Sequence, residues 1–338
     1  MTPRERTLAT LRGETPDRLA AMPIFMIWAA QNLGRSYADY VRDYRVLVEA
    51  QLRLLHEFPL DTVQTISDAW REAADCGTEL VYYDDSPPAC REHLLADKGA
   101  FARLRRPDPL GGGRMTDRVR ACAALGERVG GDVPILGWVE GPIAEGADLR
   151  GMNAMMLDLV DDPAFVEELF DWIAELEIAF ARAQIEAGAD VIGMGDAAAS
   201  LIGPGFYERY VLPREQRIFA AVHEAGALAR LHICGDTNGL LPLLGRTGAD
   251  IVDLDYPVDL EAARRHLGPQ LTILGNFDPV RALQRATPEA VFAACRRCHR
   301  QAGPPYIVGP GCEVPPGTPR ANIEAMFNYA AQAAPSAP

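Results

Sequence analysis

Residues 189–236 read ADVIGMGDAAASLIGPGFYERYVLPREQRIFAAVHEAGALARLHICGD. Two short apolar runs, 191–194 and 227–232, flank a longer stretch, 207–224, in which apolar residues recur at helical spacing. Runs with several apolar neighbours suit strands that are buried on both faces, as in parallel sheets. The stretch therefore predicts a β-α-β unit, in which a helix connects two parallel strands.

The same alternation runs through the rest of the chain. Eight apolar runs, most of them bounded by Gly, Pro or Asp, are expected to be strands: residues 22–27, 62–66, 133–139, 191–194, 227–232, 251–254, 271–274 and 306–308. The expected helices cover residues 45–58, 163–186, 207–224, 260–266 and 288–302. This α/β pattern with eight strands favours closure into a (β/α)8 barrel, or TIM barrel, and a doubly wound open sheet is the alternative.

The domain organisation follows from length and pattern. We expect the 338 residues to form a single barrel domain, 1–338, because α/β barrels of about 250 residues or more routinely form one domain. Residues 79–106 interrupt the repeat and are expected to form a hairpin excursion, followed by a glycine-rich loop at 107–113. The Ala/Pro-rich tail, 331–338, is expected to be frayed.

Composition narrows the classes of partner. A formal net charge of −14 would repel a phosphate backbone, which argues against nucleic acid. No stretch approaches the roughly 20 apolar residues of a membrane span, and residues 1–17 carry no apolar signal segment, so we expect a cytoplasmic protein that does not enter a membrane. In that compartment seven cysteines, an odd number, are better explained as thiols or metal ligands than as disulfides.

Polar side chains follow the predicted strands at their carboxyl ends. Barrel enzymes place their chemistry on the loops at this end. The polar residues just past the predicted strands are Gln31, Arg35, Asp68, Glu140, Asp196, His232, Cys234, Asp253, Asp255, Asn276 and Cys312. Asp196, Asp253 and Asn276 are equally well explained as helix caps or turn residues. Taken together, the acids, the imidazole and the thiols predict a site at this rim.

The segment His232-Ile233-Cys234 carries the sharpest chemical signal. Residues two apart on a strand point to the same side, so the imidazole and the thiol can share one ion. Thiolate and imidazole ligands at tetrahedral geometry favour zinc. Cys312, in a Gly/Pro-rich loop, is the best-placed third ligand, although a cysteine is most often a small buried hydrophobe. Three protein ligands leave a fourth position open, which is typical of a catalytic zinc site.

These residues resemble the uroporphyrinogen decarboxylase superfamily, and specifically its branch of zinc-dependent corrinoid (methylcobamide) methyltransferases. The resemblance runs from residue 23 to about residue 329. It is strongest at residues 232–236, at 273–279, and at Gly311-Cys312 with the Pro-Pro-Gly-Thr-Pro run that follows. In that branch a His-x-Cys pair and a distant cysteine bind zinc, which implies His232, Cys234 and Cys312 as the ligands here.

The resemblance also implies an activity. A methyl group would pass between a small substrate and the cobalt of a corrinoid (cobalamin), the substrate being a thiol, a methoxylated aromatic, a methylamine or betaine, or tetrahydrofolate. The family's cobalamin-binding modules carry an Asp-x-His-x-x-Gly motif. No such run is present in this sequence, so we expect the corrinoid to arrive on a separate protein. The decarboxylase relatives suggest a homodimer.

Further site residues are assigned by position. Glu140 and Asp68 are expected to hydrogen-bond the substrate or supply a proton, and loop carboxylates that satisfy backbone amides are the alternative. Asp236 either orients His232 or caps the next helix. The expected substrate-binding residues are Gln31, Arg35, Asp196, Asp255 and Asn276.

Three other functions stay open on sequence alone. A uroporphyrinogen decarboxylase of porphyrin biosynthesis is favoured by Gln31 with Gly34-Arg35 and by Asp68, which resemble that enzyme's segments. It is disfavoured by the absence of a tyrosine in residues 140–148, by Cys312 where those enzymes have histidine, and by the acidic rim. The second alternative is a non-catalytic ligand-binding barrel with a structural zinc. The third is zinc-assisted hydrolysis or lyase chemistry on the same barrel.

Overall fold

The computed structural model describes residues 1–333 of the chain. Seven parallel strands form one sheet in the order β1-β4-β5-β6-β7-β8-β9, and β2 and β3 pair antiparallel outside it. The strands are β1 Val63–Gln64, β2 Leu80–Val81, β3 Ala89–Cys90, β4 Ile135–Glu140, β5 Val191–Gly195, β6 Leu228–Ile233, β7 Ile251–Leu254, β8 Thr272–Leu274 and β9 Tyr306–Ile307.

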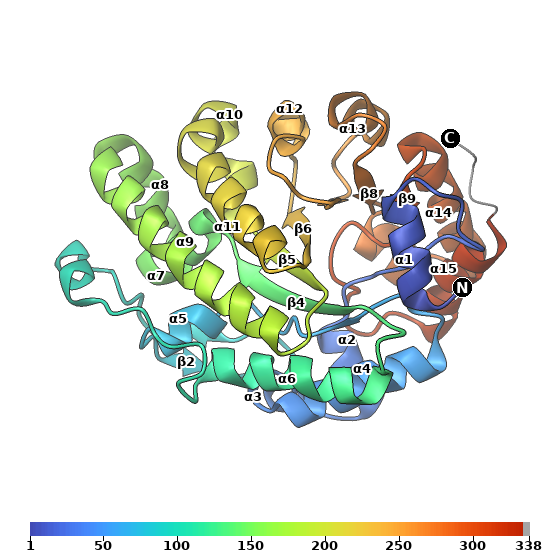
Figure 1. Ribbon diagram of the computed structural model, residues 1–338, viewed down its shortest axis with the longest axis horizontal. Helices are drawn as coiled ribbons and strands as arrows, with labels where there is room; N and C mark the ends of the chain where they lie inside the picture. Colours follow the sequence, from blue (N-terminus) through green and yellow to red (C-terminus); the bar gives the residue numbers. More distant parts are fainter. Residues whose placement is uncertain (334–338) are drawn as a thin grey trace.

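The helices lie around the outside of the strands (Figure 1). The α-helices are α1 Pro3–Leu11, α2 Ile27–Leu33, α3 Tyr37–Arg42, α4 Tyr44–Glu57, α5 Arg71–Asp75, α6 Arg114–Val129, α7 Pro142–Arg150, α8 Met152–Asp161, α9 Pro163–Glu186, α10 Gly203–Phe206, α11 Leu212–Glu224, α12 Leu241–Leu244, α13 Leu260–Leu267, α14 Pro288–Ala302 and α15 Arg320–Gln332. The 3₁₀-helices are η1 Lys98–Arg103, η2 Ala197–Leu201 and η4 Asn238–Leu240. The π-helices are η3 Tyr207–Val211 and η5 Pro279–Gln284.

An irregular extended segment takes the place of the first predicted strand. The prediction of a regular strand over 22–27 is wrong, because Pro23 has no N–H to donate to a ladder and α2 begins at Ile27. The segment still bridges the two edge strands. The Met22 N–H donates to the carbonyl of Val308 at 3.0 Å, and the Asp61 N–H donates to that of Ala21 at 3.1 Å. The fold is therefore the predicted (β/α)8 barrel, not an open sheet.

Most of the predicted elements are confirmed. Helices α9 and α14 have the predicted limits because each opens with a proline at its first position and a capping side chain before it, from Asp162 and Thr287. The predicted hairpin is β2 with β3, and residues 107–113 form the loop before α6. The helix predicted over 207–224 is divided into η3 and α11.

Several predicted segments are shifted by one or two residues, and two differ more clearly at their limits. The strand expected at 62–66 is regular only in β1, Val63–Gln64. The frayed tail expected at 331–338 is wrong for Ala331 and Gln332, which belong to α15; residues 334–338 lie outside the described part. Helix α15 lies against the chain near α1, because the Leu19 N–H donates to the carbonyl of Ala330 at 3.2 Å.

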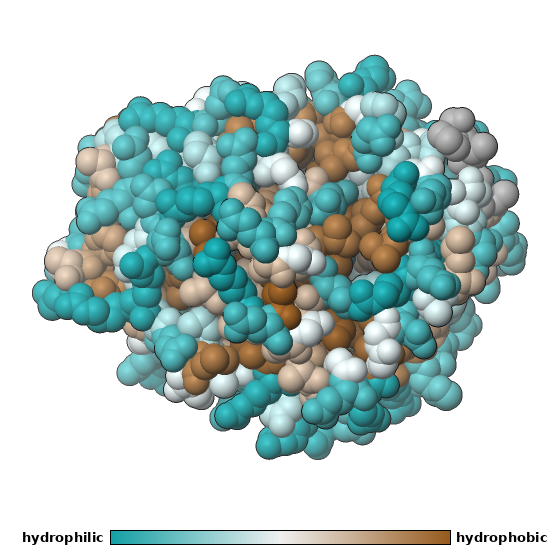
Figure 2. Space-filling model, in the orientation of Figure 1, coloured by the Kyte–Doolittle hydropathy of each residue, from teal (hydrophilic) through white to brown (hydrophobic). Residues whose placement is uncertain are grey.

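Side chains along each strand alternate between two apolar regions, the layer between strands and helices and the inside of the barrel. Ile135 and Val139 of β4 pack outward against the helices, whereas Leu136 and Trp138 point into the barrel with Ile24, Ile66 and Val191. The period of two also turns Glu140 inward at the carboxyl end of β4. The outer surface in the same view is mostly hydrophilic, with apolar side chains visible between the helices (Figure 2). The candidate functional side chains are therefore the ones that point into the barrel at the carboxyl ends of the strands.

Candidate metal centre and active site

The three predicted ligands lie together at the carboxyl ends of β6 and β9. His232 Nε2 is 3.0 Å from Cys234 Sγ, and Cys234 Sγ is 3.7 Å from Cys312 Sγ. The ligand atoms of all three lie within 4.8 Å of one another, the only such group of His, Cys, Asp or Glu among residues 1–333. Two thiolates at about 2.3 Å from a tetrahedral zinc are roughly 3.8 Å apart. The cluster therefore fits a zinc ion in donor type and in the distance between the two sulfurs.

Asp253 fixes the orientation of the histidine. The Cα of His232 pairs with that of Asp253 on β7, and His232 Nδ1 is 3.3 Å from Asp253 Oδ2 and 3.2 Å from its carbonyl oxygen. Burial alone would raise the pKa of Asp253, but Arg230 and His232 outweigh it and lower that pKa. A carboxylate that accepts from Nδ1 turns the lone pair of Nε2 toward the metal position.

Cys312 reaches the cluster because glycine precedes it. A Cβ on Gly311 would lie 2.4 Å from the backbone nitrogen of Tyr256, so only glycine lets this loop approach the end of β7. The Gly311 N–H donates to the carbonyl of Phe277 at 2.9 Å. Cys234 donates a hydrogen bond to Cys312, which lowers the pKa of the Cys312 thiol to about 4, with burial opposing and His232 adding to the effect.

A small cavity opens beside the cluster. Its volume is about 160 Å³. It is lined by Ile24, Met26, Ile66, Asp68, Ala69, Trp138, Glu140, Gly195, Ala197, His232, Cys234, Cys312 and Glu313. We call this the ligand pocket. Gly195 leaves room for it, since a Cβ there would lie 3.1 Å from both Glu140 Oε2 and Trp138 Nε1. The pocket therefore combines apolar walls with two thiols, an imidazole and three carboxyl groups.

Glu140 is a buried acid held by one arginine. Arg71 Nη2 donates to Glu140 Oε1 at 2.6 Å. Burial raises the pKa of Glu140 well above its ordinary value; Arg71 opposes this and Glu72 adds to it. A carboxyl group whose pKa is raised in this way binds a proton more readily than a free one and is suited to exchanging it with a bound molecule.

Asp68 is held differently, although it lines the same pocket. Arg114 donates to both of its oxygens, at 2.9 and 2.7 Å, and the Ser67 hydroxyl donates to Oδ2 at 2.7 Å. Burial would raise the pKa of Asp68, but Arg114 outweighs it and holds that pKa well below its usual range. With both oxygens occupied, Asp68 is suited to fixing the loop after β1 and not to moving a proton.

Comparison with known proteins bears on the whole of this architecture. The family model for uroporphyrinogen decarboxylase (URO-D) matches residues 2–333. The chain belongs to the uroporphyrinogen decarboxylase family. A methylcobamide:CoM methyltransferase (MtbA) of Methanosarcina mazei is 30% identical over 338 residues, which cover 97% of each chain. A uroporphyrinogen decarboxylase of Nocardia farcinica is 29% identical, covering 89% of this chain and 86% of its own.

A solved structure shows the same fold. A methyltransferase from Methanosarcina mazei superposes with a TM-score of 0.89 at 23% identity, covering 98% of each chain. Like the relatives above, it aligns over nearly the whole length. Among the residues that the structure describes, no helix is long and apolar enough to cross a membrane. This member of the uroporphyrinogen decarboxylase family therefore has the barrel fold of a family of enzymes. Its relatives include both methyltransferases and decarboxylases.

Asp236 and Asp255, two of the predicted residues, support the loops of this family member without lining the ligand pocket. Asp236 Oδ1 accepts from the backbone and side-chain nitrogens of Asn238, so it closes a turn, and the contact to His232 comes from Asp253 instead. Asp255 Oδ2 accepts from the Gly235 N–H at 2.7 Å, which holds the turn after Cys234.

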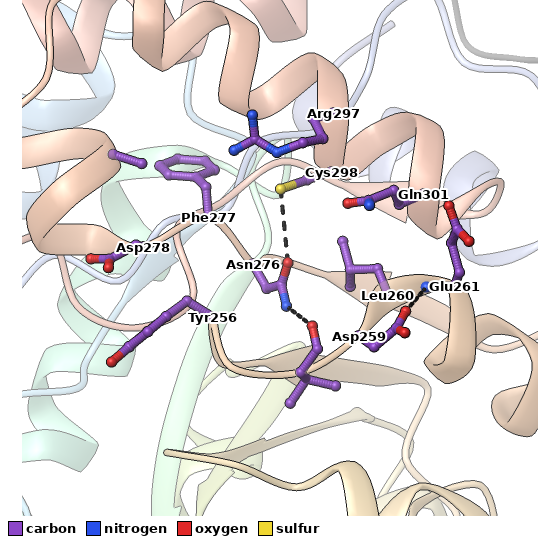
Figure 3. Close-up of a pocket in the computed structure, with 12 residues that line it drawn as sticks. Tyr256, Asp259, Leu260, Glu261, Asn276, Phe277, Asp278, Arg297, Cys298 and Gln301 are labelled. Atoms are coloured by element: carbon purple, nitrogen blue, oxygen red, sulfur yellow. Dashed lines mark hydrogen bonds between the residues drawn. The ribbon is translucent and has the colours of Figure 1, made fainter.

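Asn276 points into a separate hollow of about 370 Å³, lined also by Tyr256, Asp259 and Arg297 (Figure 3). Its side-chain amide donates to the carbonyls of Asp255 and Val258, at 3.0 and 2.7 Å, and therefore holds the loop after β7. Figure 3 shows the Cys298 thiol directed at its Oδ1 from α14.

The other predicted substrate-binding residues also lie apart from the ligand pocket. Asp196 is buried behind it and accepts from the Ala144 N–H at 2.8 Å, and burial raises its pKa to about 7. Gln31 accepts from the Gly317 N–H at 3.1 Å, and Arg35 is exposed.

Sequence reasoning missed two polar groups and the apolar walls. Glu313 directly follows Cys312 and lines the pocket, and its position beside a predicted ligand was a usable signal. Burial raises the pKa of Glu313 to about 8, although the Ile27 N–H donates to Oε1 at 2.8 Å. Asp253 was on the rim but had no assigned role; its register opposite His232 appears only in the sheet. Met26 and Trp138 carry no chemical signature in sequence.

Proposed function

We propose that this protein is a zinc-dependent methyltransferase that moves a methyl group between a small substrate and the cobalt of a corrinoid carried on a separate protein. The observation that carries the proposal is the cluster of His232, Cys234 and Cys312 at the mouth of the barrel. Three ligands of this type leave one coordination position open for a substrate atom, as catalytic zinc sites do. The methylcobamide methyltransferase among the relatives supports the choice of reaction.

The metal would supply one property. When bound, Zn²⁺ lowers the pKa of a coordinated thiol and stabilises negative charge that develops on sulfur or oxygen. Methylation of a thiol forms a sulfur–carbon bond and breaks the cobalt–carbon bond, whose electron pair stays on cobalt, while the thiol proton leaves. The reverse direction consumes that proton.

The chain's own residues supply the rest. Asp253 holds His232 in the orientation that directs Nε2 at the two sulfurs. The apolar walls from Ile24, Ile66 and Trp138 keep water from the reacting atom. Glu140 can exchange a proton with a molecule in the pocket through Oε2, which accepts no hydrogen bond from the residues that the structure describes. The Arg114 pair keeps Asp68, and with it the loop after β1, in place.

Zinc per chain, measured by elemental analysis, tests the proposal. The wild-type protein is expected to hold about one zinc ion, and Cys312→Ser to hold far less. Cys90→Ser is the matched control, since this partly exposed cysteine lies on β3 outside the cluster. Methylcobalamin turnover is then followed by absorbance with a panel of small thiols. A wild-type protein that binds no zinc after purification without chelators would contradict the metal mechanism.

Two further measurements separate the rival functions. Zinc-independent release of CO₂ from a porphyrinogen would favour the decarboxylase, as 29% identity to such an enzyme allows. A pocket of about 160 Å³ with three carboxyl groups is poorly matched to a substrate that carries eight carboxylates. A cobalt-substituted protein without exchangeable water on the metal would favour a structural ion. Spectra of that protein with and without a thiol distinguish the two cases.

A further inference from the structure

We infer that the non-reacting end of the small substrate is neutral or cationic, and that a sulfonate or carboxylate at this end is disfavoured. The inference rests on the proposed function, because it concerns the molecule whose sulfur or oxygen meets the metal position. The inferred substrate differs from CoM, the methyl acceptor in the name of the methyltransferase relative, because CoM carries a sulfonate. The charges that face the ligand pocket carry the argument.

The pocket presents acids beside the metal position. Glu140 closes one side, from the end of β4, and Glu313 closes another, directly after the ligand Cys312. The Glu313 carboxyl is fixed by the Ile27 N–H, which donates to Oε1 at 2.8 Å. A short substrate that reaches the metal position therefore places its other end against a carboxyl group.

Every arginine near the pocket is already paired. Arg71 donates to Glu140 at 2.6 Å and also to the carbonyl of Asp68. Arg114 donates to both oxygens of Asp68 and, at 2.7 Å, to the carbonyl of Val41.

Arg230 pairs with Asp253 below the ligands, where its guanidinium also lies over the Trp138 ring, 5.9 Å from the centroid. The single lysine of the chain, Lys98, pairs with Asp158 and Asp162 elsewhere. No arginine or lysine lines the pocket to receive an anion, and the one imidazole there, His232, is directed at the metal position.

An anionic end would lose its hydration in this pocket without gaining a counterion. Burying an unpaired charge is unfavourable, and a carboxylate nearby adds repulsion. Protonation of Glu140 or Glu313 would remove the repulsion but would supply no positive charge. An ammonium end, in contrast, can donate hydrogen bonds to either carboxyl group, and charge-assisted bonds of this kind are the strong ones.

Three thiols of the same length test the inference: 2-aminoethanethiol, 2-mercaptoethanol and 2-mercaptoethanesulfonate. The zinc protein is converted to its Co²⁺ form, and thiol binding is titrated by the sulfur-to-cobalt absorption band. We expect 2-aminoethanethiol to bind at least about tenfold more tightly than the sulfonate, a difference of about 1.4 kcal/mol, with the alcohol between them. The KM values with methylcobalamin as donor should follow the same order.

The variant Glu313→Gln isolates the effect of the pocket. Its amide oxygen can still accept from the Ile27 N–H, so the loop should keep its shape. The preference of the protein for the amine over the sulfonate should fall by about tenfold in this variant. Differences in acidity among the thiols cancel from the comparison, because the wild type and the variant are measured with the same thiols. Glu261→Gln, an exposed acid at the start of α13, is the matched control and should leave the preference unchanged.

The outcomes are separable. Equal or tighter binding of the sulfonate by the wild-type protein, or an unchanged preference in Glu313→Gln, overturns the inference and leaves the proposed methyl transfer standing. Failure of all three thiols to perturb the cobalt spectrum overturns the inference together with the proposed thiol chemistry.

Discussion

Asp253 Oδ2 lies 3.3 Å from Nδ1 of His232, on the strand next to it, and the same carboxylate pairs with Arg230 in the barrel interior. The contact links the candidate metal centre to the apolar and aromatic core beneath it. A carboxylate at Nδ1 sets the tautomer and raises the basicity of Nε2. The affinity of the proposed zinc site should therefore depend on a residue that is not itself a ligand.

The first prediction concerns this link. Asp253→Asn should weaken zinc binding by about 10–100-fold, as loss of such partners usually does. Competition with a chromophoric chelator at low temperature measures the affinity while the protein is folded. The unpaired Arg230 should also lower the melting temperature, because an uncompensated buried charge is destabilising. Asp236→Asn, an exposed carboxylate of a neighbouring turn, should change neither quantity; an equal effect there would refute the link.

The second prediction concerns proton transfer. Glu140→Gln should lower kcat by about 10²–10⁴-fold, the usual contribution of a general acid or base, and zinc content should stay unchanged. The amide can still meet Arg71, so the fold around β4 should be kept. Turnover of the variant is measured beside its zinc content. Wild-type turnover would remove Glu140 from the mechanism.

The third prediction assigns Asp68 a supporting role. Asp68→Asn breaks a buried pair with Arg114 and should reduce the free energy of unfolding by about 3 kcal/mol, measured with urea. Because the folded pKa of Asp68 is depressed, its contribution is present above the unfolded value of about 3.9 and is lost as pH falls below it. The difference between wild type and variant should therefore shrink in acid. Full stability with abolished turnover would instead indicate a chemical role.

The fourth prediction concerns the room that Gly195 leaves. Gly195→Ala places a methyl group 3.1 Å from Glu140 Oε2 and Trp138 Nε1, and thiol affinity should fall by about tenfold or more. Zinc content should be unchanged, because no ligand atom is among these contacts. Gly205→Ala, whose added Cβ meets no atom within 4 Å, is the matched control. Unchanged thiol affinity in Gly195→Ala would show that the substrate binds elsewhere.

The fifth prediction uses a buried carboxylate cluster, Glu72, Glu140, Glu145, Asp148 and Glu177, which surrounds Arg71. Burial raises the pKa of Glu145 and of Glu177 well above the ordinary value, and neighbouring acids add to the shift. Both oxygens of each lack partners among the described residues. A carboxyl group with a raised folded pKa stabilises the folded protein at pH values below its unfolded pKa of about 4.3. This stabilisation is lost as pH rises from that value through the folded pKa.

The free energy of unfolding should consequently fall as pH rises above the unfolded pKa of about 4.3. Glu177→Gln should reduce this fall by about 1.4 kcal/mol for each pKa unit of the shift that it removes. Urea unfolding of wild type and variant at several pH values measures the difference. Glu168→Gln, an exposed position on the same helix, should reproduce the wild-type curve. A Glu177→Gln protein with an unaltered pH dependence would contradict this account of the cluster.

The sequence predicted the parts of the fold that local chemistry determines. Helix α9 begins where Asp162 can cap it and Pro163 can occupy its first turn, and both signals lie within four residues. The proposed ligands His232 and Cys234 could be placed on one side of the chain, at the end of β6, because the side-chain period of a strand is two. At 22–27, by contrast, an apolar run predicted a strand, but Pro23 within it cannot donate to a strand ladder and the segment is irregular.

The rest of the site depends on pairing between distant segments. Arg114 and Asp68 are 46 residues apart, and nothing near either residue indicates that the loop before α6 returns to the end of β1. Asp255 and Asn276 follow strands as predicted, yet their hydrogen bonds turn them toward loops and away from the pocket. Which strand-end residues face the pocket is therefore a matter of register and loop path, which period and propensity do not specify.

Cys312 lies 78 residues after Cys234, in the last loop of the barrel. A ribosome must therefore translate the whole segment between them, including β7, β8 and β9, before the third predicted ligand is made. A nascent chain that ends before residue 312 can present at most the His-x-Cys pair, too few ligands for the three-ligand site. A zinc ion held by all three residues, as proposed, can therefore bind only after the segment that contains β7, β8 and β9 has been synthesised.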